Sequence, residues 1–492
     1  MSKQEINIVW FKRDLRFVDN EPLFNAQQSP LPVLLIYLFE PSVMAYPDSD
    51  LRHWRFVYES LKELNEKLKP SNAQIFIFHN EAQKVFEVLV DCFSIHSVYS
   101  SEETGNQLTF ARDKSMKVLF KKNNIHWQEF QTNGIVRGLK SRKQWQQLWE
   151  QKMTSAPKML NEKQLYVTQM EDAIYGVVKG VDLDTSITTR NIKFQQGGES
   201  WAWRYLKDFI NERAAGYSKN ISSPLLSRKS CSRLSPYLAY GNISMRMVYH
   251  FTIKHYEHSS NKRALSNFMS RLHWHCHFIQ KFEDECRYEH ENINRAFNQL
   301  EKPRNEDYIK AWQTGQTGVP IVDACMRCVV ETGYLNFRMR AMVVSFFAYN
   351  LWQNWTDLHF LARQFLDYEP GIHYPQLQMQ SGTTGINTIR IYNPLKNAED
   401  HDKEGLFVKQ WIPELRDIPA SLVHEPHNLT AIEQRLYNCE IGKDYPFPIV
   451  DVEATRKKAS DIMWGFRKGA EVKSEAKKIL EKHVNTSSSR KF

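Results

Sequence analysis

The sequence predicts two domains, an N-terminal α/β domain with a doubly wound parallel sheet and an all-α C-terminal domain. Three observations lead to this fold class. The chain has 492 residues, which is more than one hydrophobic core usually serves. Short apolar runs alternate with amphipathic helical patterns over residues 1–130, as in repeated strand–helix–strand units. From Glu199 onward, long helical patterns continue without strand patterns.

The strands expected in the first domain are short apolar or β-branched runs. They are INIVWF (6–11), LPVLLIYLF (31–39), AQIFIFH (73–79), HSVYSS (96–101) and IHWQEFQ (125–131). Helical periodicity separates them over residues 48–70, 80–93 and 106–123. This alternation favours parallel pairing with helices on both faces of the sheet.

The remainder of the chain divides into three parts. Residues 131–198 are polar and predict an interdomain linker with short helices. Residues 199–465 form the predicted helical domain, and residues 466–492 a basic C-terminal tail. The strongest helical patterns of that domain span residues 200–217, 244–258, 261–285, 319–333 and 337–355.

Composition limits the class of protein. A net charge of +9 is compatible with a polyanionic partner such as nucleic acid. Seven scattered cysteines argue against a secreted disulfide framework. The sequence has neither a run of 18 apolar residues nor an N-terminal signal pattern. We therefore expect a soluble, cytoplasmic monomer with no membrane partner.

Two polar segments are candidates for ligand binding. VWFKRDLRFVDNEPL (9–23) places charges directly after a strand, at the sheet edge where ligands bind in such folds. A loop of Arg–Asp ion pairs explains the same segment equally well. The hydroxyls of Ser232 and Ser235 lie at a helix start, which suits either a phosphate or simple N-capping.

Two side-chain sets carry further expectations. Arg338 and Arg340 are two residues apart, so they do not share a helix face. The arginine that points inward needs a carboxylate as its partner, and Asp367 is the candidate. Cys325 and Cys328 have metal-ligand spacing, but they lie in an apolar helical run. We therefore expect two core cysteines and no metal site.

Five motifs follow one another along the chain. They are VWFKRDLRFVDNEPL, SEETGNQLTFARD, SRLSPYLAYGNIS, AWQTGQTGVPIVDACMRCVVETGYLNFRMRAMVVSF and IYNPLKNAEDHDKEGLFVKQWIPEL. In this order they resemble the motifs of the photolyase/cryptochrome flavoprotein family, and the resemblance covers nearly the whole chain. The resemblance implies an N-terminal antenna domain, a linker and a helical domain that holds FAD. It also allows an antenna chromophore of the folate or deazaflavin type near SEETGN, although a chain without one is the alternative.

The resemblance further implies roles for individual residues. Arg340 and Asp367 match an ion pair beside the isoalloxazine, Glu369 a carboxylate that reaches the FAD ribose or base, and His373 the residue that faces flavin N5. The other implied cofactor residues are Tyr217, Cys231, Ser232, Arg233, Leu234, Ser235, His275 and Asn336. The implied catalytic residues are His373, Trp274, Trp355 and Arg271, and the implied substrate contacts are Arg271, Trp274, Phe337, Arg338 and Met379.

The chain departs from the family pattern at this site. His373 stands where repair members usually carry Asn, Leu377 and Met379 where they carry Trp, and Arg271 where they carry Glu. Phe337 and Ala341 replace an Asn and a Met. His373 is interpreted either as a group that stabilises a flavin anion or delivers a proton, or as a side chain that fills the slot. Photoreduction then needs another route, through Trp355, Trp352, Tyr349 or Tyr374, or an external reductant.

These departures leave three functions open. The leading one is light-dependent repair of pyrimidine dimers in ultraviolet-damaged DNA, single- or double-stranded, by electron transfer from reduced FAD. The alternative is a cryptochrome-type blue-light receptor that binds FAD without repair. A weaker third is repair of the (six-four) photoproduct, which needs an acid such as His273 or His275 facing the cavity.

Overall fold

The computed structural model describes residues 3–160 and 166–483. The N-terminal domain contains a sheet of five parallel strands in the order β3-β2-β1-β4-β5, as the sequence predicts. The strands are β1 (Gln4–Phe11), β2 (Val33–Leu38), β3 (Ile75–Phe78), β4 (Phe93–Ser101) and β5 (His126–Phe130). The strand order reverses between β1 and β4, so a crevice opens at the carboxyl ends of these two strands.

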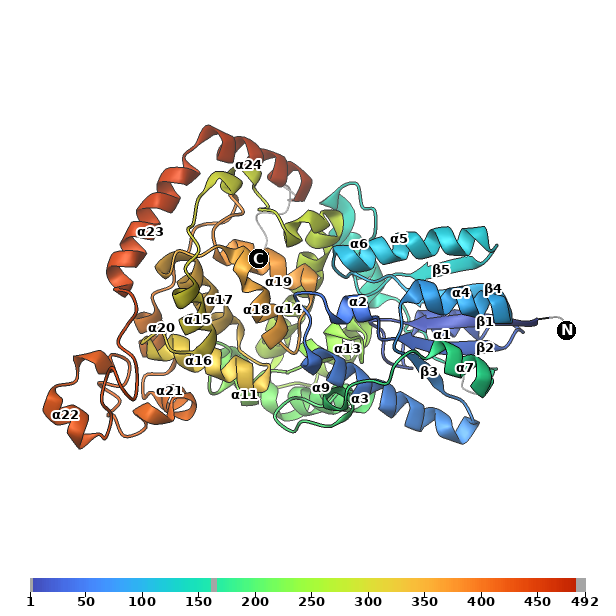
Figure 1. Cartoon of the computed structure of the whole chain (residues 1–492), viewed down its shortest axis with the longest axis horizontal. Coiled ribbons are helices and arrows are strands. Elements are labelled where there is room, and N and C mark those ends of the chain that lie inside the picture. Colours follow the sequence, from blue (N-terminus) through green and yellow to red (C-terminus); the bar gives the residue numbers. More distant parts are fainter. Residues whose placement is uncertain (1–2, 161–165, 484–492) are drawn as a thin grey trace.

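Alternate residues of the sheet belong to two different cores. Ile8 and Trp10 of β1 pack with α4 and α5, whereas Val9 and Phe11 pack with α3 and with helices of the second domain. The helices of this domain are α1 (Glu21–Ala26), α2 (Pro41–Met44), α3 (Leu51–Leu68), α4 (Ala82–Cys92) and α5 (Gln107–Lys122). Because one sheet face shares its core with the helical domain, the two domains form one body (Figure 1).

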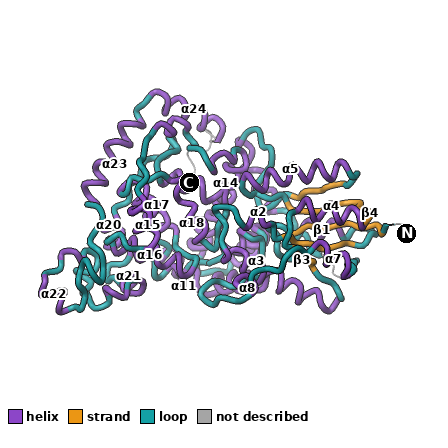
Figure 2. The backbone as a smooth tube through the Cα atoms, viewed as in Figure 1, coloured by secondary structure: helices purple, strands orange, loops and turns teal. Residues whose placement is uncertain are grey.

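The linker covers the first domain. It contains α6 (Trp145–Thr154), α7 (Asp172–Val178) and α8 (Thr185–Thr188). Tyr166 lies beside the start of β2, where its carbonyl accepts a hydrogen bond from the Val33 amide at 2.7 Å. Val178 of α7 is buried in the core beneath β1, β2 and β3. The linker is therefore packed structure with little regular secondary structure (Figure 2).

The second domain contains helices and connecting loops, and no strand among its described residues. Its helices are α9 (Glu199–Asp208), α10 (Ala214–Asn220), α11 (Ser227–Ser230), α12 (Ser235–Ala239), α13 (Met245–Tyr256), α14 (Lys262–Asp284), α15 (Glu306–Thr314), α16 (Pro320–Thr332), α17 (Phe337–Ser345), α18 (His359–Gln364), α19 (Pro370–Gln380), α20 (Pro394–His401), α21 (Leu406–Trp411) and α22 (Ala431–Leu436). In the centre of the domain, α14 and α17 both pack against α19.

Two helices at the C-terminal end, α23 (Val452–Arg467) and α24 (Ala470–His483), lie along the outer edge of the helical domain (Figure 1). Met463 of α23 and Val472 of α24 are buried against Phe297 and Tyr349. The boundary predicted at residue 465 lies inside α23. The segment predicted as a tail includes α24, which packs against the helical domain through Val472. Among the described helices, none has the length and apolar character needed to cross a membrane.

Candidate cofactor and substrate site

The ion pair between Arg340 and Asp367 lies in the middle of the helical domain. Arg340 Nη2 donates to Asp367 Oδ1 and Oδ2 at 3.0 and 2.9 Å, and its Nε donates to the Leu335 carbonyl at 2.7 Å. Burial acts to raise the pKa of Asp367, but Arg340 and a hydrogen bond from Ser235 bring it below its usual value. The carboxylate is therefore ionised, as the sequence-based pairing of these two residues requires.

Two neutral histidines flank this ion pair. His275 is on α14, close enough to Asp367 to feel its charge, and His373 is on α19. Burial lowers the pKa of His275 to about 4 and that of His373 to about 3, so both rings are uncharged near neutral pH. His275 Nδ1 and His373 Nε2 have no hydrogen-bond partner among the described residues.

The loop before α12 has an unusual backbone. Arg233 has φ of 60°, in the left-handed region that non-glycine residues seldom adopt. The guanidinium of Arg213 holds the loop by donating to the carbonyls of Cys231 and Ser232. Leu234, the next residue, is buried in the core. These contacts fix the loop that the family resemblance assigns to the FAD phosphates.

The Arg233 side chain turns toward the middle of the domain. Its guanidinium lies 3.6 Å from the centroid of the Tyr334 ring, and its Nη2 donates to Gln195 Oε1 at 2.6 Å. Its Nε has no partner among the described residues. Tyr217, buried on α10, bonds through its hydroxyl to Arg271 of α14.

Several buried polar atoms on the helices and loops around the ion pair have no hydrogen-bond partner among the described residues. Buried polar groups in folded proteins are nearly always hydrogen-bonded, so unpartnered atoms are candidates for contact with a polar ligand. They include Ser227 Oγ, Arg233 Nε, His275 Nδ1, Asn336 Oδ1, Arg338 Nε, His373 Nε2 and Gln376 Oε1, and of these Arg233, His275 and His373 lie close enough to Asp367 to feel its charge. Cations and hydroxyls suit phosphates, and the histidines and amides suit the nitrogens and oxygens of a flavin ring. The residues present thus fit FAD.

Two aromatic side chains lie at the surface of the helices that carry these groups. Trp274 of α14 is 45% exposed and Phe337, the first residue of α17, is 53% exposed. Arg271 is also exposed, while Arg338 and Met379 are half-buried. In contrast, Trp355 is buried, and its Nε1 donates to Asn292 Oδ1 at 2.7 Å.

His273 faces away from this surface. Its ring packs against Trp145 and Trp149 of α6, with centroids 5.0 and 4.9 Å apart. It therefore does not meet the condition set for an acid beside a (six-four) photoproduct. His275, the other candidate, is neutral at physiological pH because burial lowers its pKa to about 4.

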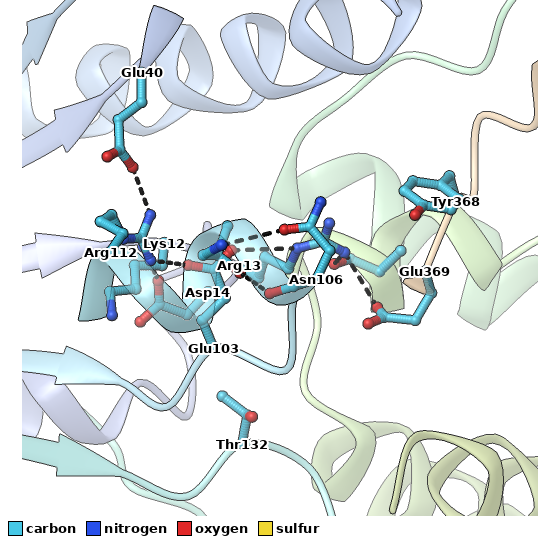
Figure 3. A network of polar contacts seen from close by, with 12 residues as sticks. Lys12, Arg13, Asp14, Glu40, Glu103, Asn106, Arg112, Thr132, Tyr368 and Glu369 are labelled. Atoms are coloured by element: carbon cyan, nitrogen blue, oxygen red, sulfur yellow. Dashed lines mark hydrogen bonds and ion pairs between the residues drawn. The ribbon is translucent and has the colours of Figure 1, made fainter. Parts of the chain in front are cut away.

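Glu369 contacts the N-terminal domain. Its Oε2 accepts a hydrogen bond from Arg13 Nη1 at 3.3 Å, across the domain interface (Figure 3). Its Oε1 is buried without a partner among the described residues. Burial raises the pKa of Glu369 to about 7, although Arg13 opposes the shift. Sequence reasoning singled out Glu369 but missed Arg13 as its partner; the charged loop after the first strand was the available signal.

Further ion pairs lie at the carboxyl ends of the strands (Figure 3). Lys12 Nζ contacts Asp113 Oδ2 at 3.1 Å, and Arg112 contacts both Glu40 and Glu103. Beside them is a cavity of about 80 Å³ between the domains. Its lining includes Trp10, Tyr37, Trp54, Asp48 and Tyr368. The loop after β1 thus forms ion pairs and also lines a cavity, while ligand binding at this sheet edge stays a prediction.

The C-x-x-C pair lies in the core. Cys325 and Cys328 are both buried on α16 as free thiols. Cys328 Sγ lies 3.5 Å from the Tyr334 carbonyl and 3.6 Å from Arg228 Nη1. No group of three or more His, Cys, Asp or Glu side chains suited to a metal occurs in the described part of the chain.

The buried carboxyl of Glu369 predicts a specific pH dependence. Its pKa rises from 4.5 in the unfolded chain to about 7 in the folded one, so only the folded form holds the proton between these values. Stability therefore falls as pH increases through this window, by about 3 kcal/mol in total. Between pH ~5 and ~8, the free energy of unfolding of the wild type should decrease. In Glu369→Gln, which has no titrating group at this position, the decrease over the same pH range should be smaller by about 2–3 kcal/mol. Urea titrations at both pH values measure this; equal losses in both proteins would contradict it.

Comparison with known proteins places this site in a class. Residues 268–465 match the family model of the FAD binding domain of DNA photolyase, and residues 7–147 match the DNA photolyase model. Together the two models cover more than half of the chain. The class defined by fold and site is that of the FAD-binding photolyase-type flavoproteins.

Relatives extend the match over nearly the full length. A deoxyribodipyrimidine photo-lyase of Alkalihalophilus pseudofirmus is 24% identical over 94% of this chain and 99% of its own. A cryptochrome DASH of Gloeobacter violaceus is 26% identical over 90% of this chain and 93% of its own. A class III photolyase structure from Agrobacterium tumefaciens has a TM-score of 0.79 at 24% identity and covers 95% of this chain and 99% of that one. This chain belongs to the photolyase/cryptochrome family.

Proposed function

We propose that this chain repairs ultraviolet-induced cyclobutane pyrimidine dimers in DNA in a light-dependent reaction that uses FAD. The observation that carries the proposal is the exposed aromatic side chain of Trp274, on a helix, α14, that packs against α19. Enzymes that act on a base first extrude it from the stack, and aromatic side chains then hold the unstacked base. A lesion is poorly stacked and is therefore cheaper to extrude.

We propose that the unpartnered buried groups hold FAD. Arg233, Ser232 and Ser235 would bind its phosphates, and Arg340, Asp367, His275 and His373 would surround the flavin ring. When bound, FAD supplies the light-absorbing electron donor. Arg340 provides a fixed positive charge, which stabilises negative charge in a site that excludes water.

His373 acts in this proposal as a neutral hydrogen-bonding group. Burial lowers its pKa to about 3, so near neutral pH it has no ring proton to spare as an acid. It can offer one N–H donor or one ring acceptor to the flavin. This supports a positioning role for His373 and argues against a role as general acid.

The lesion type follows from the same reasoning. Repair of the (six-four) photoproduct needs an acid beside the lesion. His273 packs against α6, and His275 is neutral. The proposal is therefore limited to cyclobutane dimers, whose splitting requires an electron and no proton.

DNA is the proposed partner. The chain has a net charge of +9, and Arg271 is exposed beside Trp274 on α14. Binding through such cations weakens steeply with salt because phosphate contacts release counterions. The relative from Alkalihalophilus pseudofirmus is named a deoxyribodipyrimidine photo-lyase, which supports this choice.

The second candidate is a blue-light receptor that binds FAD and repairs nothing. Phe337, Ala341 and Met379 change the substrate side of the site relative to repair members of the family. The relatives named cryptochrome DASH support this alternative. Only a repair assay separates the two candidates.

The assay uses purified protein with chemically reduced flavin, ultraviolet-damaged oligonucleotide and blue light. We expect loss of cyclobutane dimers in the light and none in the dark. Trp274→Ala should weaken lesion binding by about 1–3 kcal/mol, the usual contribution of one stacked base. Val330→Ala, a change at an exposed apolar residue of α16, serves as control. If dimers persist in both single and double strands while the flavin remains photoactive, the repair proposal is overturned and the receptor becomes the favoured function.

An antenna chromophore remains a prediction. The cavity between the domains, about 80 Å³, is small beside the ~300–1,000 Å³ of typical ligand sites. A photolyase structure from Sulfolobus tokodaii, with a TM-score of 0.76, is described as holding two FAD molecules, with a novel light-harvesting cofactor implied. The absorption spectrum of the purified protein, compared with that of FAD alone, tests for a second chromophore.

A further inference from the structure

Two buried tyrosines share one carboxylate at the domain interface. The hydroxyl of Tyr368 donates to Asp48 Oδ2, and the hydroxyl of Tyr374 lies 3.3 Å from the same oxygen. The two phenolic oxygens are 3.4 Å apart. Tyr368, Tyr374 and Asp48 are 5%, 1% and 3% exposed, so the cluster is shielded from solvent. This arrangement gives each phenol a proton acceptor inside the protein.

The cluster contacts His373 directly. The His373 ring lies edge-on to both phenols, with centroids 5.3 Å from Tyr368 and 5.4 Å from Tyr374. Tyr374 is the residue after His373 on α19, and Tyr368 lies just before that helix. A flavin that contacts His373 is therefore one side chain away from two phenols.

A further hydrogen-bonding group and a cavity lie beside the phenols. His359 Nδ1 is 3.4 Å from the Tyr374 hydroxyl, and burial lowers the pKa of His359, which favours its neutral form and makes Asp48 the better candidate for the phenolic proton. Asp48 and Tyr368 also line the cavity between the domains. A cavity of about 80 Å³ has room for several waters, which need about 10–15 Å³ each by this measure. Asp48 thus borders a cavity large enough to hold water.

The expected tryptophan route is interrupted next to the flavin. Leu377, which stands where the family carries a tryptophan, is buried on α19. Trp355 is not among the described rings in contact with His373, and its Nε1 donates a hydrogen bond to Asn292. Among the described residues, the aromatic rings that pack against His373 are Phe365, Tyr368 and Tyr374, and of these the two phenols are redox-active.

We propose that Tyr374 and Tyr368 form a redox-active pair that supplies the electron for photoreduction of FAD, with Asp48 as the acceptor of the phenolic proton. This inference rests on the proposed binding of FAD beside His373. It assigns the pair a role in activating the cofactor before repair, which is separate from the splitting of the lesion.

In the proposed photoreduction, a thiol such as dithiothreitol is the final reductant. With FAD bound, Tyr374 would give one electron to the photoexcited oxidised flavin. Its phenolic O–H bond would break, the proton would move to Asp48 Oδ2, and a neutral tyrosyl radical would remain on Tyr374. A thiol then gives one hydrogen atom to the radical, which restores the phenol. Two thiyl radicals combine to a disulfide, and Asp48 releases its proton to water in the cavity.

Burial explains why electron and proton move together. Burial is the largest of the effects that raise the pKa of Tyr368 and Tyr374 well above the ordinary value, so both phenols are protonated before the reaction. A charged phenol radical cation in this core would be costly, whereas transfer of the proton to Asp48 leaves the radical neutral. Photoreduction should therefore slow in deuterated water.

The test follows blue-light photoreduction of protein-bound oxidised FAD with dithiothreitol present. We expect Tyr374→Phe/Tyr368→Phe to lower the rate at least ~10-fold and Asp48→Asn to lower it in the same direction. Frozen, illuminated wild type should show a tyrosyl radical by electron paramagnetic resonance, and the double variant should not. The matched control is Tyr445→Phe, which removes another buried phenol bonded to a carboxylate, Asp323, at 2.5 Å. Its photoreduction rate should equal that of wild type.

Further outcomes separate this inference from the proposed function. With chemically reduced flavin, the double variant should repair dimers at the wild-type rate, because the pair acts only before repair. Wild-type photoreduction in a variant that retains FAD, or a tryptophan radical instead of a tyrosyl radical, overturns the tyrosine pair and leaves the proposed function intact. If the double variant loses FAD, the single variants Tyr374→Phe and Asp48→Asn are tested instead. An unchanged photoreduction rate in both, with FAD retained, overturns the tyrosine pair. Wild-type protein that binds no FAD overturns both.

Discussion

Replacing Arg340 with methionine should destabilise the helical domain by about 3–5 kcal/mol and abolish retention of FAD. Arg340 donates twice to Asp367, a carboxylate that is almost fully shielded and held ionised. Without the guanidinium, Asp367 either remains as an unpaired buried charge or takes up a proton, and both changes are unfavourable. In the proposed site, the flavin ring would also lose a fixed positive charge.

Urea unfolding and the flavin content of purified protein measure the two effects. Arg340→Met/Asp367→Asn should recover part of the lost stability, because removing both partners leaves no unpaired charge. It should not recover FAD. Arg327→Met is the control: its partner Glu414, 2.9 Å away, is 32% exposed where Asp367 is 8% exposed, so loss of this pair leaves no buried charge and should cost about 0–1 kcal/mol. A loss below 1 kcal/mol in Arg340→Met, with wild-type flavin content, would refute the assigned role.

The second large effect is expected at the domain interface. Arg246→Met should cost about 3–5 kcal/mol and loosen the contact between the domains. Arg246 of α13 is buried and donates to Asp19, which lies in the loop after β1, and to Glu21 Oε1 at 3.0 Å. Asp19 also accepts from Ser244 at 2.6 Å and from the Lys158 amide at 2.7 Å. One carboxylate thus joins the α/β domain, the linker and the helical domain.

The same pair has a defined pH dependence. Although burial opposes the shift, Arg246 lowers the pKa of Asp19 below 3.8 in the folded protein. Its stabilising contribution is therefore present above that value and is lost as pH falls through the folded pKa. Arg246→Met should remove this acid-sensitive part of the stability.

Unfolding titrations and limited proteolysis of the linker test this prediction. Arg456→Met, on the surface of α23, removes an exposed ion pair with Glu453 and should cost less than ~0.5 kcal/mol. The prediction is wrong if Arg246→Met unfolds cooperatively at the same denaturant concentration as the wild type and if protease cleaves residues 131–198 no faster. That result would show that the interface does not depend on this pair.

The fold class could be predicted because the local pattern of apolar and polar residues determines which face of each strand or helix is buried. Isoleucine, valine and leucine in short runs made the five parallel strands recognisable, and 3.6-residue periodicity made the long helices recognisable. The pairing of Arg340 with Asp367 was also predictable. An inward-pointing arginine on a helix needs a carboxylate, and Asp367 is 27 positions further along the chain.

Contacts between distant segments could not be predicted in the same way. Arg13 and Glu369 are 356 positions apart, and no periodicity links them. The same holds for Asp48, which lies 320 positions from Tyr368 and meets it only because the domains share a core. The linker looked featureless in sequence since its few apolar residues become a core only against the sheet.

The sequence alone therefore determined the two-domain architecture, the family resemblance and the segment around His373 that carries the candidate cofactor residues. The tertiary structure decided the partner of each polar group: Glu369 pairs with Arg13, His273 faces α6, and two tyrosines share Asp48 beside His373. The physical reason is range. Burial and periodicity act within a segment and are written in its residues, whereas hydrogen bonds and ion pairs join segments that only the packed chain brings within 3–4 Å.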